Sequence, residues 1–172
     1  MKKTLVDLFE ESVRLYPNNT FLLEKTGKVF EPTTYTEVKE KVYQLGAGLQ
    51  ALGVKKGDNM ALLSEGRNMW VIGELSMFYA GAVNVPLSIK LEESNDLLFR
   101  LIHGDVKFIM VSGTQLKKIR LIKDKLTDVQ KVIVFDEQDH YEDKEISLAE
   151  VQKMGDEYLA NHALEEFLRV PN

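Results

Sequence analysis

The chain has 172 residues, enough for one domain that buries about 70% of the surface its unfolded form would expose. Hydrophobic residues make up 44% and charged residues 28%, as in ordinary globular domains. The formal net charge of -5 is spread along the chain without a basic stripe, which argues against nucleic acid as a partner.

Composition excludes several further classes of protein. Without cysteine the chain has no disulfide, no thiolate metal site and no cysteine nucleophile. The opening MKKTLVDLFEESV is interrupted by acidic residues and lacks the apolar core of a signal peptide. No apolar run approaches the roughly 20 residues that a membrane span needs. These features predict a cytoplasmic protein.

The N-terminal part predicts a helix followed by a small hairpin. Thr4 and Asp7 have the spacing of a capping box for a helix over residues 4–16, which Pro17 would end. Its expected apolar face comprises Leu5, Leu8, Phe9 and Val13. Residues 21–25 and 28–30 flank a Thr-Gly turn and predict the hairpin.

The strongest helix pattern begins at Thr34, where Thr34 and Glu37 form a second capping box. Apolar residues then recur every three or four positions as far as Leu52, and Gly53 provides a left-handed end. The segment GAGLQA at residues 46–51 matches the GxGxxA spelling of nucleotide-binding turns. It lies deep inside the helix, so close packing of a neighbouring element is the preferred interpretation.

The central part alternates apolar strands with helices. Residues 60–63 form an unbroken apolar strand, and Asn68 is expected to cap a helix that reaches about residue 80 and is buried on more than one side. Gly81 ends that helix, and residues 83–87 form the next strand. Pro86 cannot donate a ladder hydrogen bond, so it belongs at the strand's end or at a sheet edge.

The same rhythm continues toward the C-terminus. The expected helices cover residues 94–103, 114–125 and 147–161, with Ser94 as the cap of the first; the expected strands cover residues 108–111 and 132–135. Residues 136–145 are charged and loop-like. The pattern predicts an α/β fold: a mostly parallel sheet flanked by helices on both faces, built from βαβ units, with a small N-terminal hairpin. The final residues, 164–172, are expected to lack a closing element, as in a chain cut at a linker.

No catalytic constellation is present in the sequence. There is no G-x-S-x-G elbow, and SGT at residues 112–114 is not followed by the glycine and lysine of a Walker loop. Anion binding at the start of that helix stays open, with an ordinary helix cap as the default. The acidic tract around Asp136, Asp139, His140 and Asp143 lacks the glycine and terminal glutamate of a calcium loop, so a solvated loop is expected.

The order of three motifs resembles the adenylate-forming superfamily of acyl-CoA synthetases, amino-acid-activating domains and luciferases. TYTEV at residues 34–38 is similar to the family's (S/T)Y-x-E-L motif, GVKKGDNMALL at 53–63 leads into a strand, and AGAVNVPL at 80–87 looks like G-A-x-x-V-P-L. SEGRNMW at residues 64–70 resembles the S-E-N-R-P-E-W of long-chain fatty acyl-CoA ligases, although Gly66, Asn68 and Met69 depart from it. The marker residues are Thr34, Tyr35, Glu37, Gly57, Asp58, Gly81 and Pro86.

The resemblance implies that residues 1–172 form a single N-terminal subdomain of a larger enzyme. The intact enzyme would activate a fatty acid with ATP and Mg²⁺ to acyl-AMP and pass the acyl group to coenzyme A. The family's phosphate loop and its adenylation lysine have no counterpart here, so this chain is expected to be inactive and to bind no cofactor.

The resemblance implies two partners: the remainder of the same polypeptide and the fatty acid. A sheet edge exposed by the cut could also pair with a second copy of the chain. The intact enzyme could also associate peripherally with a membrane. The expected substrate-proximal loop follows a strand end and comprises Ser64, Glu65, Arg67 and Asn68. Two alternatives stay open: an amino-acid or aryl-acid adenylating domain, and a complete small α/β binding module of receiver or flavodoxin type.

Overall fold

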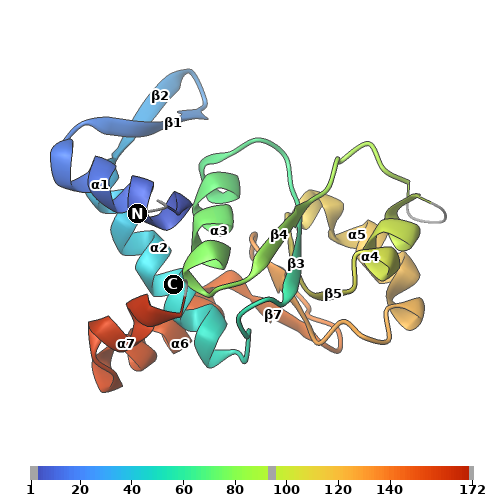
Figure 1. Ribbon diagram of the computed structural model, residues 1–172. Helices are drawn as coiled ribbons and strands as arrows, with labels where there is room; N and C mark the ends of the chain where they lie inside the picture. The colour runs from blue at the N-terminus through green and yellow to red at the C-terminus, as the bar shows by residue number, and fades with distance from the viewer. Residues whose placement is uncertain (1–3, 93–95, 171–172) are drawn as a thin grey trace.

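The computed structural model describes residues 4–92 and 96–170 and has the expected α/β architecture (Figure 1). Its main sheet has five parallel strands in the order β4-β3-β5-β6-β7: β4 (Val83–Pro86), β3 (Asn59–Leu63), β5 (Val106–Val111), β6 (Lys131–Val134) and β7 (Glu145–Ser147). A separate antiparallel hairpin consists of β1 (Thr20–Thr26) and β2 (Val29–Thr34). The helices are α1 (Leu5–Leu15), α2 (Tyr35–Ala51), α3 (Asn68–Tyr79), α4 (Leu98–His103), α5 (Gly113–Ile122), the 3₁₀ turn η2 (Lys123–Lys125), α6 (Leu148–Asn161) and α7 (Leu164–Arg169).

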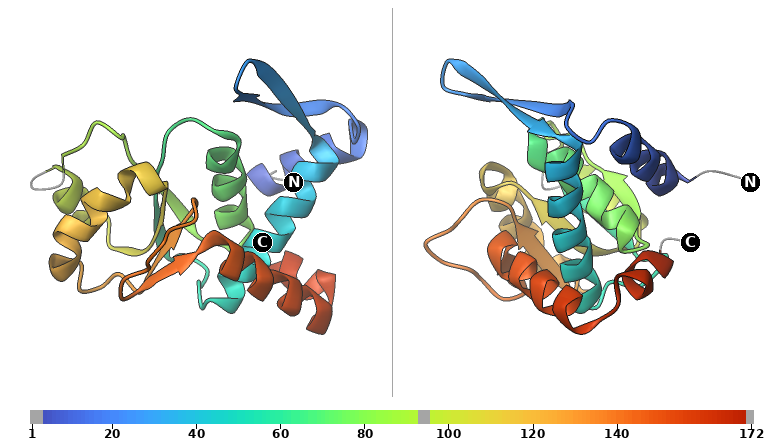
Figure 2. Two further views of the ribbon diagram at one scale, coloured as in Figure 1. Left: turned by 180° about the vertical axis from the view of Figure 1, so that it is seen from behind. Right: turned by 90° about the vertical axis from the view of Figure 1, so that its left-hand side faces the viewer.

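Helices cover both faces of the sheet, as predicted (Figures 1 and 2). On β3, Met60 and Leu62 face the core shared with α2, α3 and α6, whereas Ala61 and Leu63 face the core shared with α4 and α5. Every one of these four side chains is fully buried. The strand is therefore apolar without interruption because it lies between two cores.

Helix α1 begins with the predicted capping box, in which the amide of Asp7 donates to the Thr4 hydroxyl. Its buried face differs from the prediction: Val6 is buried beside Phe9 and Val13, while Leu5 and Leu8 are 60% and 47% exposed. The apolar residues of α1 span a wide arc, and α2 and α3 cover only one side of it. Periodicity alone could not distinguish the two stripes.

The GxGxxA segment is confirmed as a packing surface of α2. A methyl group on Gly48 would lie 2.1 Å from the carbonyl oxygen of Val151, and one on Gly155 would lie 1.8 Å from that of Gln44. Helices α2 and α6 therefore approach closely enough that only glycine fits. The predicted helix end is also confirmed: Gly53 has a φ of +105°, and the amide of Val54 donates to the carbonyl of Leu49 at 3.0 Å, as in a Schellman motif.

The start of α3 corrects one expectation. Arg67, not Asn68, takes the N-cap position, and its side chain makes no capping bond. The amide of Asn68 instead donates to Oε1 of Glu24, which reaches over from the hairpin at 3.3 Å. The narrow polar stripe of α3 also faces inward, because Gly73 and Ser76 are both buried and the Ser76 hydroxyl donates to the carbonyl of Ile72 at 2.6 Å.

The strand after Gly81 lies at the open edge of the sheet, which is where Pro86 is expected. Gly81 has a φ of +78° and ends the turn after α3. Val83 is 50% exposed, so this strand is less buried than its valines suggest.

The C-terminal part contains two elements that the sequence did not predict. Strand β7 lies within the charged segment, and α7 places Phe167 in the core with no exposed surface, so the expectation that the last residues lack a closing element is wrong. Helix α5 starts at Gly113 with Ser112 as its N-cap, one residue before the predicted start. The expected cap at Ser94 lies outside the described residues. No helix in the described ranges is long and apolar enough to cross a membrane.

Candidate functional site at the carboxyl edge of the sheet

The loop at residues 64–68 lies at the carboxyl edge of the parallel sheet, beside the loops that follow β5 and β6. The chain passes from β3 to β4 on one side and then crosses to β5 on the other side of β3. Such a change of direction is where open α/β sheets usually bind ligands. The geometry of this edge therefore decides what the predicted loop can do.

Glu65 is held by the first turn of α5, the helix that follows β5. Its Oε1 accepts a hydrogen bond of 2.6 Å from Nε2 of the buried Gln115, and the hydroxyl of the buried Ser64 donates to the carbonyl of Glu65 at 3.0 Å. Burial raises the pKa of Glu65, but polar contacts from Ser112 and Gln115 outweigh it and hold that pKa below its usual value. The carboxylate is therefore ionised and engaged within the chain.

Arg67 is held by the loop that follows β6. Its Nη1 donates to both carboxylate oxygens of Asp136, at 2.8 and 2.9 Å, and the amide of Gly113 donates to the same carboxylate at 2.8 Å. Burial raises the pKa of Asp136, and these bonds lower it further than burial raises it. The amide of Gly113, the first residue of α5, already donates to Asp136. A carboxylate of the chain itself therefore occupies the helix start where binding of an external anion was left open.

Asn68 belongs to a different group of contacts. Its Nδ2 donates to the hydroxyl of Thr33 at 3.4 Å, and its amide donates to Glu24, so it faces the hairpin. The structure thus brings Glu65 to the start of α5 and Arg67 to the loop after β6, keeps Ser64 within its own loop, and leaves Asn68 apart. Gln115 and Asp136 were not predicted as partners, although Asp136 directly follows the predicted strand 132–135 and Gln115 lies at the start of the predicted helix 114–125.

Pro86 ends β4 at this edge, and the other marker residues are structural joints elsewhere in the fold. Tyr35 stacks on Phe21 with ring centroids 4.4 Å apart, next to the capping box of Thr34 and Glu37. At the amino ends of β3 and β4, the amide of Gly57 (φ +91°) donates to the carbonyl of Gly81 at 2.8 Å. The carboxylate of Asp58 accepts from the amide of Lys55 at 2.8 Å. Gly57, Asp58 and Gly81 therefore fix the turns that precede β3 and β4.

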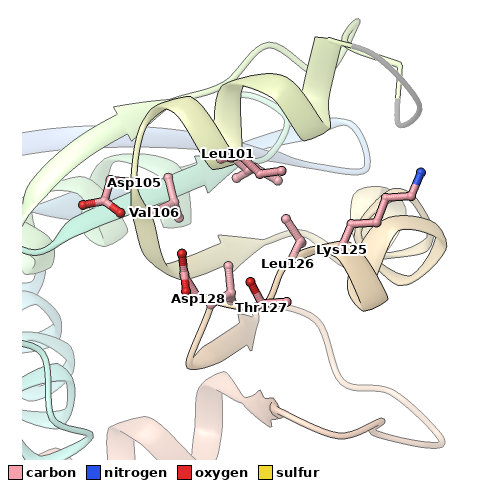
Figure 3. A pocket seen from close by; sticks show the side chains of 9 residues that line it. Leu101, Asp105, Val106, Lys125, Leu126, Thr127 and Asp128 are labelled. Carbon is pink, nitrogen blue, oxygen red and sulfur yellow. The ribbon is translucent and has the colours of Figure 1, made fainter.

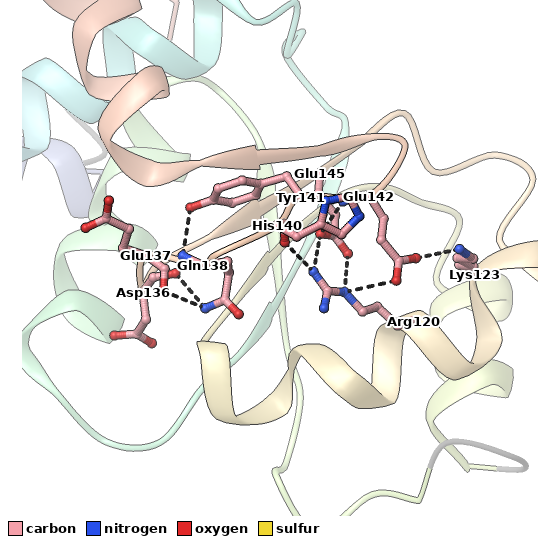
Figure 4. A network of polar contacts seen from close by, with 9 residues as sticks. All are labelled: Arg120, Lys123, Asp136, Glu137, Gln138, His140, Tyr141, Glu142 and Glu145. Atoms are coloured by element: carbon pink, nitrogen blue, oxygen red, sulfur yellow. Dashed lines mark hydrogen bonds and ion pairs between the residues drawn. The ribbon is translucent and has the colours of Figure 1, made fainter.

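The acidic tract after β6 forms an ion-pair network (Figure 4). Arg120 of α5 donates to both oxygens of Glu145, at 2.8 and 2.7 Å, and to the carbonyl of His140 at 3.0 Å. Lys123 pairs with Glu142. Burial raises the pKa of Glu145, but the hydrogen bonds from Arg120 outweigh it and lower that pKa. Basic partners from α5 and η2 therefore fix Glu142 and Glu145, whereas Asp139, His140 and Asp143 are exposed, as expected for a solvated loop.

Two cavities lie away from the predicted loop. One of about 70 Å³ is at the amino end of β5, between Leu101, Val106 and the segment 125–129 (Figure 3). Another of about 320 Å³ lies between the end of β6, Tyr141 and the start of α6. Neither is lined by residues 64–68.

The carboxylates at this edge do not fit a bound metal. Both carboxylates are already engaged within the chain: Asp136 pairs with Arg67, and Glu65 accepts a hydrogen bond from Gln115. Within the described ranges no group of three or more histidine, cysteine, aspartate or glutamate side chains could hold a metal ion.

Comparison with known proteins decides the family. The model of the family described as AMP-binding enzyme matches residues 9–166. The chain belongs to this family. A 3-[(3aS,4S,7aS)-7a-methyl-1,5-dioxo-octahydro-1H-inden-4-yl]propanoyl:CoA ligase of Mycobacterium tuberculosis is 33% identical over 100 residues, which cover 57% of this chain and 19% of that protein. Long chain acyl-CoA synthetase 8 of Arabidopsis thaliana is 26% identical over 172 residues, covering 89% of this chain and 23% of the relative.

Solved structures of similar proteins agree with this family at the level of the fold. A long-chain-fatty-acid-CoA ligase from Archaeoglobus fulgidus superposes with a TM-score of 0.78 at 19% identity, over 90% of this chain and 30% of that chain. An anthranilate CoA ligase in complex with anthranoyl-AMP gives 0.75 at 22% identity, over 86% and 27%. This AMP-binding enzyme chain therefore spans less than a third of the length of each of these four relatives.

Proposed function

We propose that this chain is the N-terminal scaffold of an AMP-forming acyl-CoA ligase that acts on long-chain fatty acids. The observation that carries the proposal is the self-paired carboxyl edge, where Arg67 binds Asp136 and Glu65 binds Gln115. A catalytic edge would present groups that can engage substrate or stabilise transferred phosphate charge. These groups engage each other, so they brace loops and leave the chemistry to other parts of the enzyme.

The intact enzyme would form acyl-AMP from the fatty acid and ATP, release pyrophosphate, and transfer the acyl group to coenzyme A. Support comes from the family match over residues 9–166 and from the similarity to a plant long-chain acyl-CoA synthetase. ATP, Mg²⁺ and coenzyme A would be bound by the remainder of the polypeptide. The chain itself would contribute a rigid sheet, with residues 64–68 beside the substrate.

An aryl-acid or amino-acid ligase is the second candidate. It is favoured by the similarity to an anthranilate CoA ligase and to surfactin synthase subunit 1 of Bacillus subtilis, which is 33% identical over 85 residues. The family match weakens the third alternative, a complete receiver or flavodoxin-like module.

The test is an assay of the full-length gene product for AMP formation that depends on coenzyme A. The panel contains palmitate, oleate, anthranilate, benzoate and the common amino acids. The proposal expects fatty acids to give the highest kcat/KM. Highest activity with an aryl or amino acid would replace the fatty acid with the second candidate, and no activity with any acid would reject the ligase. A cytoplasmic location and a homo-oligomer stay predictions.

A further inference from the structure

Two tyrosines of α2 and α3 touch both terminal helices of the described chain. Tyr43 and Tyr79 pack against each other with ring centroids 5.3 Å apart. Both hydroxyl groups donate to Glu10 of α1. Both rings also contact Phe167 of α7. Figures 1 and 2 show α1 and α7 at the same end of the molecule, away from α4 and α5.

On the α1 side, the contact is made by the carboxylate of Glu10. Its Oε1 accepts from the Tyr43 hydroxyl at 2.6 Å and also from the Tyr79 hydroxyl, and its Oε2 accepts from Nζ of Lys39 at 2.7 Å. Hydrogen bonds to an ionised carboxylate are stronger than neutral ones, and they fix the positions of both phenol rings. Phe9 adds an edge-to-face contact with Tyr79, with centroids 6.4 Å apart.

On the α7 side, the contact is made by the ring of Phe167. This side chain is fully buried, and its centroid lies 5.4 Å from that of Tyr43 and 5.9 Å from that of Tyr79. Nε2 of Gln50 donates to the carbonyls of Tyr79 and Phe167, at 3.1 and 3.4 Å, and so joins α3 to α7. Helix α7 has only six residues, and Phe167 is its one buried side chain.

The two contacts share the same pair of rings, so neither can change without affecting the other. Loss of the Glu10 carboxylate frees the phenol groups that form the wall of the Phe167 site. Loss of the Phe167 ring removes a surface that both tyrosine rings pack against. Without it, the tyrosine hydroxyls are held less firmly near Glu10. Contacts that share partners in this way are expected to be non-additive.

We propose that Tyr43 and Tyr79 form a two-sided latch that couples the docking of α1 to the docking of α7, so that the two helices loosen together. Coupling of this kind is reciprocal: if Glu10 stabilises α7 by some factor, Phe167 stabilises α1 by the same factor. The latch is a property of the described chain and does not depend on which acid the intact enzyme activates.

Residue-resolved amide hydrogen exchange on the 172-residue chain tests the latch. Glu10→Gln in α1 should speed exchange of the α7 amides about fivefold, and Phe167→Leu in α7 should speed exchange in α1 by a similar factor. Leu5→Ala and Leu164→Ala are matched controls, because both side chains are exposed, at 60% and 49%. Each control should leave the opposite helix unchanged, and the amides of α5, on the other face of the sheet, serve as an internal reference.

If either variant fails to fold, milder ones give the same information. Tyr43→Phe removes one hydrogen bond to Glu10 and keeps the ring against Phe167, and Gln50→Leu loosens α7 without touching the rings' contact with Glu10. Faster exchange confined to the substituted helix would overturn the proposal. So would additive unfolding free energies for Glu10→Gln and Phe167→Leu in a double-mutant cycle.

Discussion

Nη1 of Arg67 donates hydrogen bonds to both carboxylate oxygens of Asp136, at 2.8 and 2.9 Å. The two residues are 69 positions apart in the chain and follow β3 and β6, with β5 between them. Asp136 also accepts from the first amide of α5, so one carboxylate fixes the loops that follow three neighbouring strands. This arrangement supports a braced scaffold at the edge of the sheet where ligands are usually bound.

Substitution of Asp136 should loosen that edge. Asp136→Ala leaves the partly buried amide of Gly113 and the guanidinium of Arg67 without their acceptor. We expect the free energy of unfolding to fall by about 1–2 kcal/mol, because the pair is partly exposed and the amide loses a charged acceptor. Urea denaturation measures the change. Asp139→Ala is the control, since Asp139 is exposed in the same loop and should shift the midpoint little.

Glu24 should act as a helix cap supplied from the hairpin. Its side chain accepts from the amide of Asn68 in the first turn of α3, at a position where Arg67 provides no capping bond. Glu24→Ala should therefore destabilise the chain by about 1 kcal/mol, as for loss of an ordinary N-cap. The adjacent Glu31, which pairs with Glu24 across the hairpin, is the control. Thermal unfolding measures both variants. If Glu31→Ala lowers the stability as much as Glu24→Ala does, the effect belongs to the hairpin and not to the helix cap.

Gly155 should be irreplaceable by alanine. A methyl group there would lie 1.8 Å from the carbonyl oxygen of Gln44, so α6 would have to move away from α2. The cost should reach about 3 kcal/mol, at the upper end for overpacking. Gly66→Ala is the matched control, because its methyl group would meet nothing within 4 Å. If Gly155→Ala unfolds at the same urea concentration as the wild type, that result would contradict the close approach of α2 and α6.

Glu10 should make the stability of the chain depend on pH in acid. Burial raises its pKa, but hydrogen bonds from Lys39 and the two tyrosines outweigh burial and hold the pKa below 4.5. A depressed folded pKa stabilises the fold above the unfolded value, and this stabilisation is lost as the pH falls through the folded pKa. The unfolding free energies of the wild type and Glu10→Gln should differ by about 1–2 kcal/mol at pH 7 and converge below pH 4.5. A difference that stays constant with pH would contradict this role.

Local signals in the sequence predicted much of the fold. Both capping boxes form, and Gly53 ends α2 with the expected left-handed turn. The apolar run at residues 60–63 is a central strand, and Pro86 ends an edge strand. Each of these features depends on residues within about one turn of each other, which is the range over which propensity and capping act.

The features that the sequence did not reveal depend on distant contacts. Strand β7 has three residues in a charged segment and is fixed when Arg120 of α5 binds Glu145. Leu164, Phe167 and Leu168 have the i, i+3, i+4 spacing of a helix, but α7 has only six residues, and the burial of Phe167 depends on rings contributed by α2 and α3. At the candidate site, the strand-end rule located residues 64–67, but which donor would reach which carboxylate required the sheet order.

ATP–pyrophosphate exchange by the isolated 172-residue chain tests whether the chain acts only as a scaffold. The assay contains Mg²⁺ and, in turn, long-chain fatty acids, aryl acids and amino acids, with the full-length gene product as the positive control. We expect exchange by the full-length protein with a fatty acid and none above background by the isolated chain. Measurable exchange by the isolated chain would contradict its role as a scaffold.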